Sequence, residues 1–254
     1  MRVTVLGSGT SSGVPVIGCP CPTCRSDDPN DQRLRPSILL ETKDAAVVFD
    51  TSTDFRQQML RADVRHLDAV VFTHHHCDHV AGFDDIRAFN FLSGQALPIY
   101  TLPDTLAALQ RMFNYVFTPP EQIGGGIPQI IPTVIDDAPF TVNGLEIVPI
   151  PLKHGIMRVN GYRIGDFAYC TDTNYIPPES FELLDGVKVL ILDALRYRRH
   201  PTHFTVDEAI ETAYRIGAER TYFTHIAHQI KHADLSSQLP DGIELARDGL
   251  VIEL

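Results

Sequence analysis

This sequence lacks long hydrophobic runs and has few basic side chains. No apolar stretch approaches the roughly 18 residues that a membrane-spanning helix needs, so we expect no membrane partner. The sequence has 21 Lys and Arg but 32 Asp and Glu, which gives a formal net charge of −11. Because a long nucleic acid needs clustered Lys and Arg to neutralise its phosphates, this balance argues against such a partner. A small anionic substrate beside a bound cation is still compatible with it.

Neither an internal repeat nor a linker divides the chain. Its 254 residues are enough for one domain with a proper buried core, which we expect to span residues 1–254. The opening segment Met1–Gly7 is too short for a secretory signal and predicts a first strand. We therefore expect a cytoplasmic protein.

The cysteines do not make an even set, since there are five. Three of them stand together, as Cys19, Cys21 and Cys24. In a cytosolic chain this spacing and an odd count favour metal binding over disulfides, with a redox cluster as the alternative. Three thiolates need a fourth ligand to close a tetrahedral zinc site, and both His228 and His232 are candidates.

What the chain does have is a dense group of metal-binding side chains after the apolar stretch Ala69–Phe72. The pattern is H-x-H-x-D-H, formed by His74, His76, Asp78 and His79. The first two lie two residues apart, so an extended backbone places them on the same side. Imidazole and carboxylate groups bind zinc-like ions, and a strand followed by a turn can aim several of them at one point. The pattern predicts two adjacent metal ions.

This pattern is the signature of the metallo-β-lactamase superfamily, which the chain resembles. The resemblance implies an α/β fold with four layers, an αβ/βα sandwich in which two mixed sheets are flanked by helices. The metals would lie at one rim. It also implies three further ligands, each following a later strand. The sequence supplies His154, Asp172 and His225, each after an apolar run.

The resemblance implies two divalent ions, zinc or manganese, at this rim. One would be held by His74, His76 and His154, the other by Asp78, His79 and His225, and Asp172 would bridge them. The antibiotic-cleaving branch typically lacks the counterparts of His79 and Asp172. A complete set of seven ligands is typical of the phosphodiesterase, ribonuclease and thioesterase branches.

Strand patterns recur along the chain with helical patterns among them, which fits two layered sheets better than a doubly wound fold. The predicted strands are Arg2–Leu6, Ser37–Glu41, Ala46–Asp50, Ala69–Phe72, Ile99–Thr101, Gln129–Ile135, Leu145–Ile150, Gly161–Ile164, Phe167–Cys170, Val187–Leu192, Arg220–Thr224 and Leu250–Leu254. The predicted helices are Phe55–Ala62, Gly82–Leu92, Pro103–Phe113 and one that runs from a capping box at Thr205 to Ile216. Gly124–Gly126 predicts a long loop, either functional or a plain connector.

The cysteines and the segment His225–His228 narrow the resemblance to the bacterial phosphoribosyl 1,2-cyclic phosphate phosphodiesterases of phosphonate degradation. Matching phrases are Gly13–Pro15, Gly18–Cys24, Thr73–Gly82, Cys170–Thr173 and Thr224–His228. In that family the cysteines and the later histidine hold a structural zinc. The resemblance therefore implies a third metal site made by Cys19, Cys21, Cys24 and His228. It also implies a homodimer.

The implied reaction is hydrolysis of a small cyclic phosphate by a water activated between the two ions that Asp172 bridges. The leaving oxygen needs a proton, and His203 matches the position of the family's active-site histidine. We predict that His203 is a general acid or a phosphate binder, with His200 as its rival.

The chain has one dense basic stretch, which could anchor a terminal phosphate of the substrate. Its residues are Arg196, Arg198, Arg199 and His200. A solvated loop is the alternative. Asp50, at a strand end, is a candidate for orienting a ligand imidazole, with a plain turn carboxylate as the alternative.

Two other functions stay open. One is a thioesterase-type metallo-hydrolase that uses the same metal site. The other is a non-hydrolytic accessory protein, similar to the relative that assists pyrroloquinoline quinone synthesis, which carries a similar cysteine cluster. The complete set of seven ligands favours hydrolysis.

Overall fold

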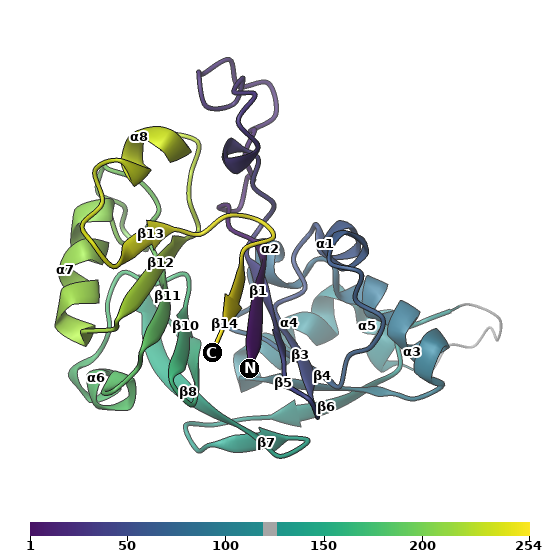
Figure 1. Cartoon of the computed structure of the whole chain (residues 1–254). Helices are drawn as coiled ribbons and strands as arrows, with labels where there is room; N and C mark the ends of the chain where they lie inside the picture. The colour runs from purple at the N-terminus through teal and green to yellow at the C-terminus, as the bar shows by residue number, and fades with distance from the viewer. Residues whose placement is uncertain (119–125) are drawn as a thin grey trace.

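In the computed structural model, the apolar runs of the sequence form strands that assemble into two seven-stranded sheets (Figure 1). The structure describes residues 1–118 and 126–254, so most of the glycine-rich segment Gly124–Gly126 lies outside the described residues. The strands are β1 Arg2–Gly7, β2 Ser37–Glu41, β3 Ala46–Phe49, β4 Ala69–Val71, β5 Leu97–Thr101, β6 Ile130–Val134, β7 Phe140–Val142, β8 Leu145–His154, β9 Met157–Ile164, β10 Phe167–Cys170, β11 Val189–Asp193, β12 Arg220–Thr224, β13 Ile243–Leu245 and β14 Val251–Glu253.

Both sheets are mixed, as predicted. The first has the order β14-β1-β2-β3-β4-β5-β6, and the second has the order β13-β12-β11-β10-β9-β8-β7. In the first sheet β3 to β6 run parallel, and in the second sheet β10 to β13 run parallel. The other pairs in each sheet are antiparallel. Each sheet therefore has a group of strands whose carboxyl ends meet at one edge.

Alternate side chains of the inner strands enter two different cores, because successive residues of a strand point to opposite faces. In β3, Val47 and Phe49 lie between the two sheets while Val48 faces the outer layer. In β10, Phe167 and Tyr169 likewise face the space between the sheets. These strands are apolar throughout because both of their faces are covered.

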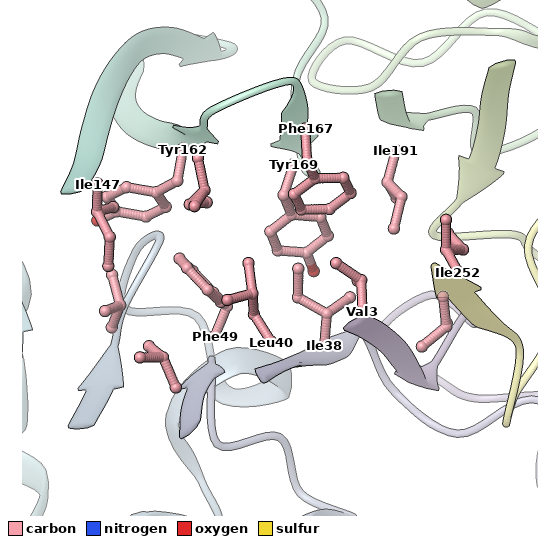
Figure 2. Close-up of a cluster of buried hydrophobic side chains, with 14 of the residues drawn as sticks. Val3, Ile38, Leu40, Phe49, Ile147, Tyr162, Phe167, Tyr169, Ile191 and Ile252 are labelled. Atoms are coloured by element: carbon pink, nitrogen blue, oxygen red, sulfur yellow. The ribbon is translucent and has the colours of Figure 1, made fainter. Parts of the chain in front are cut away.

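Aromatic side chains fill the centre of the layer between the sheets. Figure 2 shows Tyr162 and Tyr169 of the second sheet pointing toward Phe49 of the first. The ring centroids of Phe49 and Tyr162 are 5.4 Å apart, and those of Phe49 and Tyr169 are 6.2 Å apart. The Tyr162 hydroxyl donates a hydrogen bond of 2.7 Å to the carbonyl oxygen of Phe72. The two sheets are thus joined by packing and by this buried hydrogen bond.

Helices cover the outer face of each sheet and complete the four predicted layers (Figure 1). Phe55, Phe89 and Leu109 pack on the first sheet, and Ala209 and Leu235 pack on the second. The helices are α1 Phe55–Arg61, α2 Cys77–Val80, α3 Arg87–Ser93, α4 Pro103–Met112, α5 Asn114–Phe117, α6 Pro178–Leu184, α7 Val206–Ile216 and α8 His232–Ser236, with short 3-10 turns at Pro29–Asp31 and Phe83–Ile86. None of the described helices combines the length and hydropathy of a membrane span.

The structure departs from the predicted elements at short strands, at prolines and at some element ends. Strand β9 begins at Met157 and not at Gly161, and the predicted helix Gly82–Leu92 is a 3-10 turn followed by α3. Strands β7 and β13 have three residues each, too few to show a periodic pattern. Pro149 and Pro151 made the sequence pattern appear to end at Ile150, but β8 continues to His154. There it turns sharply into β9 through Gly155, whose φ is 65°. His154 is therefore the last residue of a strand at a tight hairpin.

We expect Phe49→Ala to lower the free energy of unfolding by about 3–5 kcal/mol, because it leaves a cavity between the two sheets. Denaturant unfolding followed by circular dichroism measures the change. Tyr214→Ala is the matched control, since Tyr214 is 63% exposed. Its free energy of unfolding should change by no more than about 0.5 kcal/mol. Equal losses for both variants would show that the intersheet packing is not what stabilises the fold.

Candidate metal centre

The candidate ligands lie where parallel strands end, so the two sheets deliver them to one edge. Strand β4 leads into His74, β10 into Asp172, and β12 into His225. Antiparallel β8 ends on His154 at the same place. Side chains at carboxyl ends of neighbouring strands converge in α/β folds, and here both sheets contribute. Ligands far apart in sequence are thereby brought together.

The backbone at this edge is strained. Asp50, Asp172 and His225 have φ values of 64°, 52° and 61°. A left-handed conformation of a residue other than glycine costs on the order of 1–3 kcal/mol, and it persists only where the surroundings impose it. Each of the three follows a strand of the parallel groups: β3, β10 and β12. Such a concentration of strain at one edge marks a functional site.

A short helical turn aims the second half of the H-x-H-x-D-H pattern inward. His76 precedes α2, and the backbone N–H of His79 donates to the carbonyl of His76 at 2.9 Å. Asp78 and His79 are buried as a result. Gly82 ends this segment against the loop that follows β3, and its N–H donates to Thr51 at 3.0 Å. A Cβ atom at this glycine would collide with the Ser52 carbonyl oxygen, so the close approach requires glycine.

One cluster contains three histidines and one carboxylate. The ligand atoms of His74, His76, His154 and Asp172 all lie within 4.8 Å of one another. The ring centroids of His74 and His76 are 4.6 Å apart, and those of His76 and His154 are 5.0 Å apart. His76 is exposed while the other three are buried, so this cluster has access to solvent.

A second cluster is fully buried and contains Asp78, His79, Asp172 and His225. The Nε2 atom of His79 lies 3.1 Å from Asp172 Oδ1, and the Nε2 atom of His225 lies 3.3 Å from Asp172 Oδ2. The same Oδ2 atom is 3.9 Å from His74 Nε2 of the first cluster. Asp172 is thus shared between the two clusters, as a bridging ligand would be.

The donor atoms of these clusters suit divalent metal ions. The Nε2 atoms of His74 and His79 are buried and have no hydrogen-bond partner among the residues that the structure describes. Burial lowers the pKa of His74 well below its usual range and that of His154 to about 4, which keeps both neutral as metal ligands must be. Burial acts on His79 in the same direction, but Asp172 and Asp50 outweigh it and raise its pKa. The second cluster therefore stabilises positive charge.

Hydrogen bonds to the other ring nitrogens orient these ligands. The Nδ1 atom of His79 lies 2.7 Å from Asp50 Oδ2, the position that the sequence suggested for Asp50. Thr73 supports this carboxylate through its N–H and its hydroxyl, both at 2.8 Å. The Nδ1 atom of His154 donates to the carbonyl oxygen of Thr202 at 2.8 Å, a partner that no sequence pattern indicated. Such partners fix the ring so that Nε2 faces the metal.

His203 lies directly beside both clusters. Its ring centroid is 4.5 Å from that of His154 and 4.5 Å from that of His225. Its Nδ1 atom is 2.9 Å from Asp193 Oδ2, at the end of β11. Burial would lower the pKa of His203, but Asp193 and the nearby carboxylates raise it to about 9. Asp193 thus favours the protonated form of the histidine predicted as the acid, and sequence reasoning missed this partner.

The rival His200 lies further out. Its ring centroid is 5.1 Å from that of His203, and its Nδ1 atom is 3.1 Å from the hydroxyl of Thr202. The guanidinium of Arg196 donates to the carbonyl oxygens of Arg198 at 3.1 Å and Arg199 at 3.3 Å. Arg196 therefore shapes its own loop, and the phosphate-binding role of this basic stretch stays a prediction.

The basic stretch also borders a cavity. This cavity of about 350 Å³ is lined by Arg196, Tyr197, Arg198 and Gln229. Arg198 and Arg199 are exposed. An anionic part of a substrate would meet two guanidinium groups there.

The three clustered cysteines meet His228 across the molecule. The Sγ atoms of Cys19, Cys21 and Cys24 lie 3.3, 3.4 and 3.6 Å from His228 Nδ1. His232, the other candidate, is instead 2.9 Å from the guanidinium of Arg33. Three sulfurs and one imidazole nitrogen, all within 4.8 Å of one another, form the donor set of a tetrahedral zinc site.

The thiols of this cluster differ in acidity. A hydrogen bond from the backbone N–H of Cys24 lowers the pKa of Cys21 to about 6, and His228 acts in the same direction. Burial raises the pKa of Cys24 to about 11. At least one thiolate is therefore available at neutral pH, as zinc binding needs.

Comparison with known proteins assigns the family. A family model described as a β-lactamase superfamily domain matches residues 46–226. The chain belongs to the metallo-β-lactamase superfamily. It is similar to the crystal structure of a diphosphatase from the PhnP family, with 42% identity over 100% of this chain and 97% of that chain and a TM-score of 0.93. The predicted superfamily, its fold and the likeness to this branch are confirmed.

Other superfamily relatives have different names. An octanoyltransferase of Porphyromonas gingivalis is 39% identical over 98% of this chain and 51% of its own length. The zinc-bound PqqB structure from Methylobacterium extorquens shares the fold, with 21% identity over 100% of both chains and a TM-score of 0.80. The chain spans about half the length of the curated relatives that it matches. Family and clusters together support a metal-dependent hydrolase.

We expect Cys21→Ser to remove one tightly held zinc per chain and to lower the melting temperature, because a structural zinc contributes directly to folding. At saturating metal concentration, turnover should change less than stability does. Metal analysis of the purified protein and thermal unfolding measure the two effects. An unchanged zinc content in the variant would exclude the assignment of this cluster as a third metal site.

Proposed function

We propose that this protein is a metal-dependent phosphodiesterase that hydrolyses a small cyclic phosphate of the phosphoribosyl 1,2-cyclic phosphate type. The observation that carries the proposal is Asp172, whose carboxylate is shared by two clusters beside a histidine with a raised pKa. The similarity to a diphosphatase along the whole chain supports phosphate chemistry. The net charge of −11 fits a small phosphorylated substrate better than a long nucleic acid.

The seven residues of the two clusters would hold two divalent ions, zinc or manganese. Bound there, the ions would lower the pKa of a coordinated water and stabilise negative charge on the phosphate. The first cluster, which has the exposed His76, is open to the substrate. Because the second cluster is buried, bulk water is kept from it, and electrostatic interactions between its ion and the phosphate would be stronger there.

In this proposal His203 protonates the leaving oxygen. Because its Nδ1 atom is bonded to Asp193, the proton that it can give to a substrate is the one on Nε2. Asp193 also accepts a hydrogen bond of 3.1 Å from the backbone N–H of Thr173, which fixes the carboxylate. The oxygen of a water molecule forms a bond to phosphorus and its proton passes to solvent, while the P–O bond to the leaving oxygen breaks and this oxygen takes the proton of His203. His203 is left neutral, and it is recharged from solvent.

A second candidate is hydrolysis of a thioester at the same site. One relative is named an octanoyltransferase, so a fatty-acyl thioester is the substrate class to compare. A non-hydrolytic accessory role is the third candidate, in line with the similarity to PqqB. Assays of bis(p-nitrophenyl) phosphate and of an octanoyl thioester, each with added Mn²⁺ or Zn²⁺, separate the three. Hydrolysis of neither substrate would favour the accessory role.

We expect Asp172→Ala to reduce turnover of bis(p-nitrophenyl) phosphate to background, a loss of at least about 10²-fold. The reason is that Asp172 belongs to both clusters, so its removal takes one ligand from each. Asp166→Ala is the matched control, since the Asp166 side chain is 52% exposed and pairs with Lys188. Circular dichroism should show that both variants are folded. Wild-type turnover by the Asp172 variant at full metal content would exclude the dinuclear site.

We expect His203→Ala to slow the hydrolysis of diesters with poor leaving groups, such as a ribose hydroxyl, by about 10²–10⁴-fold. Esters of p-nitrophenol should be affected far less, because that leaving group departs without a proton. The ratio of the two rates, measured for each variant, is the readout. His200→Ala should show little of this contrast. If His203→Ala slowed both substrates equally, His203 would be a phosphate binder or a structural residue.

A further inference from the structure

The two kinds of metal cluster share one short turn. His225, at the end of β12, belongs to the buried second cluster, and His228, three residues later, belongs to the cysteine cluster. Whatever holds His228 in place therefore also constrains the backbone of His225. This backbone is strained, with a φ of 61°. A strained conformation needs support from its surroundings in order to persist.

The ring of His225 has less direct hydrogen-bond support than the rings of His79 and His154. His79 and His154 have their Nδ1 atoms bonded to Asp50 and Thr202 at 2.7 and 2.8 Å. The Nδ1 atom of His225 is buried without a hydrogen-bond partner among the described residues, and the nearest carboxylate oxygen, on Asp193, is 3.9 Å away. Apart from its stacking on His203, with ring centroids 4.5 Å apart, the position of this ring depends on the backbone turn that carries it.

That turn is bonded to the segment that precedes the loop with the three clustered cysteines, residues 15–30, here called the cysteine loop. The N–H of Ile226 donates to the carbonyl of Ser8 at 3.0 Å, and the N–H of Thr10 donates to the carbonyl of Ile226 at 3.1 Å. Residues 8–10, which precede the loop, are thus hydrogen-bonded to Ile226, which lies between His225 of the second cluster and His228 of the cysteine cluster. A movement of the loop would be transmitted through these bonds to His225.

The cysteine loop has few buried side chains that could stabilise it. Between Pro15 and Asn30 only Thr23 is buried, and Ile17 is 97% exposed. The base of the loop is fixed by backbone bonds at Gly9 and Val14, to Leu34 at 2.8 Å and Arg33 at 2.9 Å. Beyond the base, two contacts among the described residues tie the loop to the rest of the molecule. One is the group of three sulfurs around His228, and the other, at the end of the loop, is the Asp31 carboxylate, which accepts a hydrogen bond of 2.8 Å from the backbone N–H of His232. A metal ion bound by the sulfurs and His228 would fasten the loop to the turn.

We propose that the cluster of Cys19, Cys21, Cys24 and His228 positions His225, so that a metal ion bound in this cluster increases the metal affinity of the buried second cluster. The first cluster, made by His74, His76, His154 and the shared Asp172, contains no residue of this turn, so its metal affinity is not affected. The cysteines and His228 are positioning residues in this scheme. The proposal rests on the metal ligands of the proposed function and is independent of its substrate.

The test measures each metal position separately by titration calorimetry with Mn²⁺. In a His76→Ala background the second cluster keeps its ligands, and in an Asp78→Ala background the first cluster does. Adding His228→Ala should weaken Mn²⁺ binding by about 10-fold or more in the first background, as loss of an orienting partner does in other metal sites. In the second background it should leave the binding constant unchanged.

His228→Cys is the matched rescue, because four thiolates also form a tetrahedral zinc site. It should restore zinc in the loop and Mn²⁺ affinity in the His76→Ala background. Ile17→Ser changes the same loop at an exposed position and should alter neither constant. In the His228→Ala variant, amide hydrogen exchange should quicken at residues 225–228 and not at residues 73–80.

Three results would overturn the proposal. One is equal weakening at both positions, which would mean general destabilisation. Another is unchanged Mn²⁺ affinity in the His76→Ala background after the loop zinc is lost. The third is failure of His228→Cys to restore the affinity while it restores the zinc. Hydrolytic activity is not a readout, so a protein without phosphodiesterase activity could still show the coupling.

Discussion

The site depends on carboxylates that are buried where the two sheets meet at one edge. Asp50, Asp78, Asp172 and Asp193 are each at most 7% exposed. An isolated charge in a protein interior costs on the order of several kcal/mol, so this group is stable only with compensating positive charge. His203, whose pKa is raised by Asp193, supplies part of it. Two divalent ions would supply four positive charges at the two points where the imidazoles converge.

The rigidity of the two sheets is what keeps these groups together. Phe49, Tyr162 and Tyr169 fill the space between the sheets, and strands that are apolar on both faces stop just before the polar residues. Because the strands are fixed on both sides, their ends can hold Asp50, Asp172 and His225 in strained conformations. A site built on strand ends is held more accurately than one built on long loops. The packing energy of the core thus supports the geometry of the site.

Local sequence patterns were sufficient for the parts of the site that lie close together in the chain. His74 to His79 form one spaced motif. The distant ligands His154, Asp172 and His225, each after an apolar strand, were implied by the family resemblance and not by a local pattern alone. Contacts between distant residues could not be predicted in this way. The Thr202 carbonyl that orients His154 has no side-chain signature, and Asp193 meets His203 only because a loop returns to β11. The choice of His228 over His232 depends partly on Arg33, which engages His232 from 199 residues away. The short strands β7 and β13 were missed because three residues show no period.

The two clusters differ in chemistry, and this difference gives each a separate task. The first has three imidazoles and an exposed member, His76, while the second is fully buried and has Asp78 in addition to Asp172. Imidazole ligands suit zinc and similar ions, whereas carboxylate oxygens suit harder ions such as manganese. The second cluster also has more negative charge around it, because the Asp50 carboxylate is bonded to Nδ1 of His79. The exposed, nitrogen-rich position is therefore suited to meeting the substrate, and the buried, oxygen-rich position to neutralising the carboxylates. His203 stands against rings of both clusters, so in the proposed reaction it would supply a proton wherever between them the bond breaks.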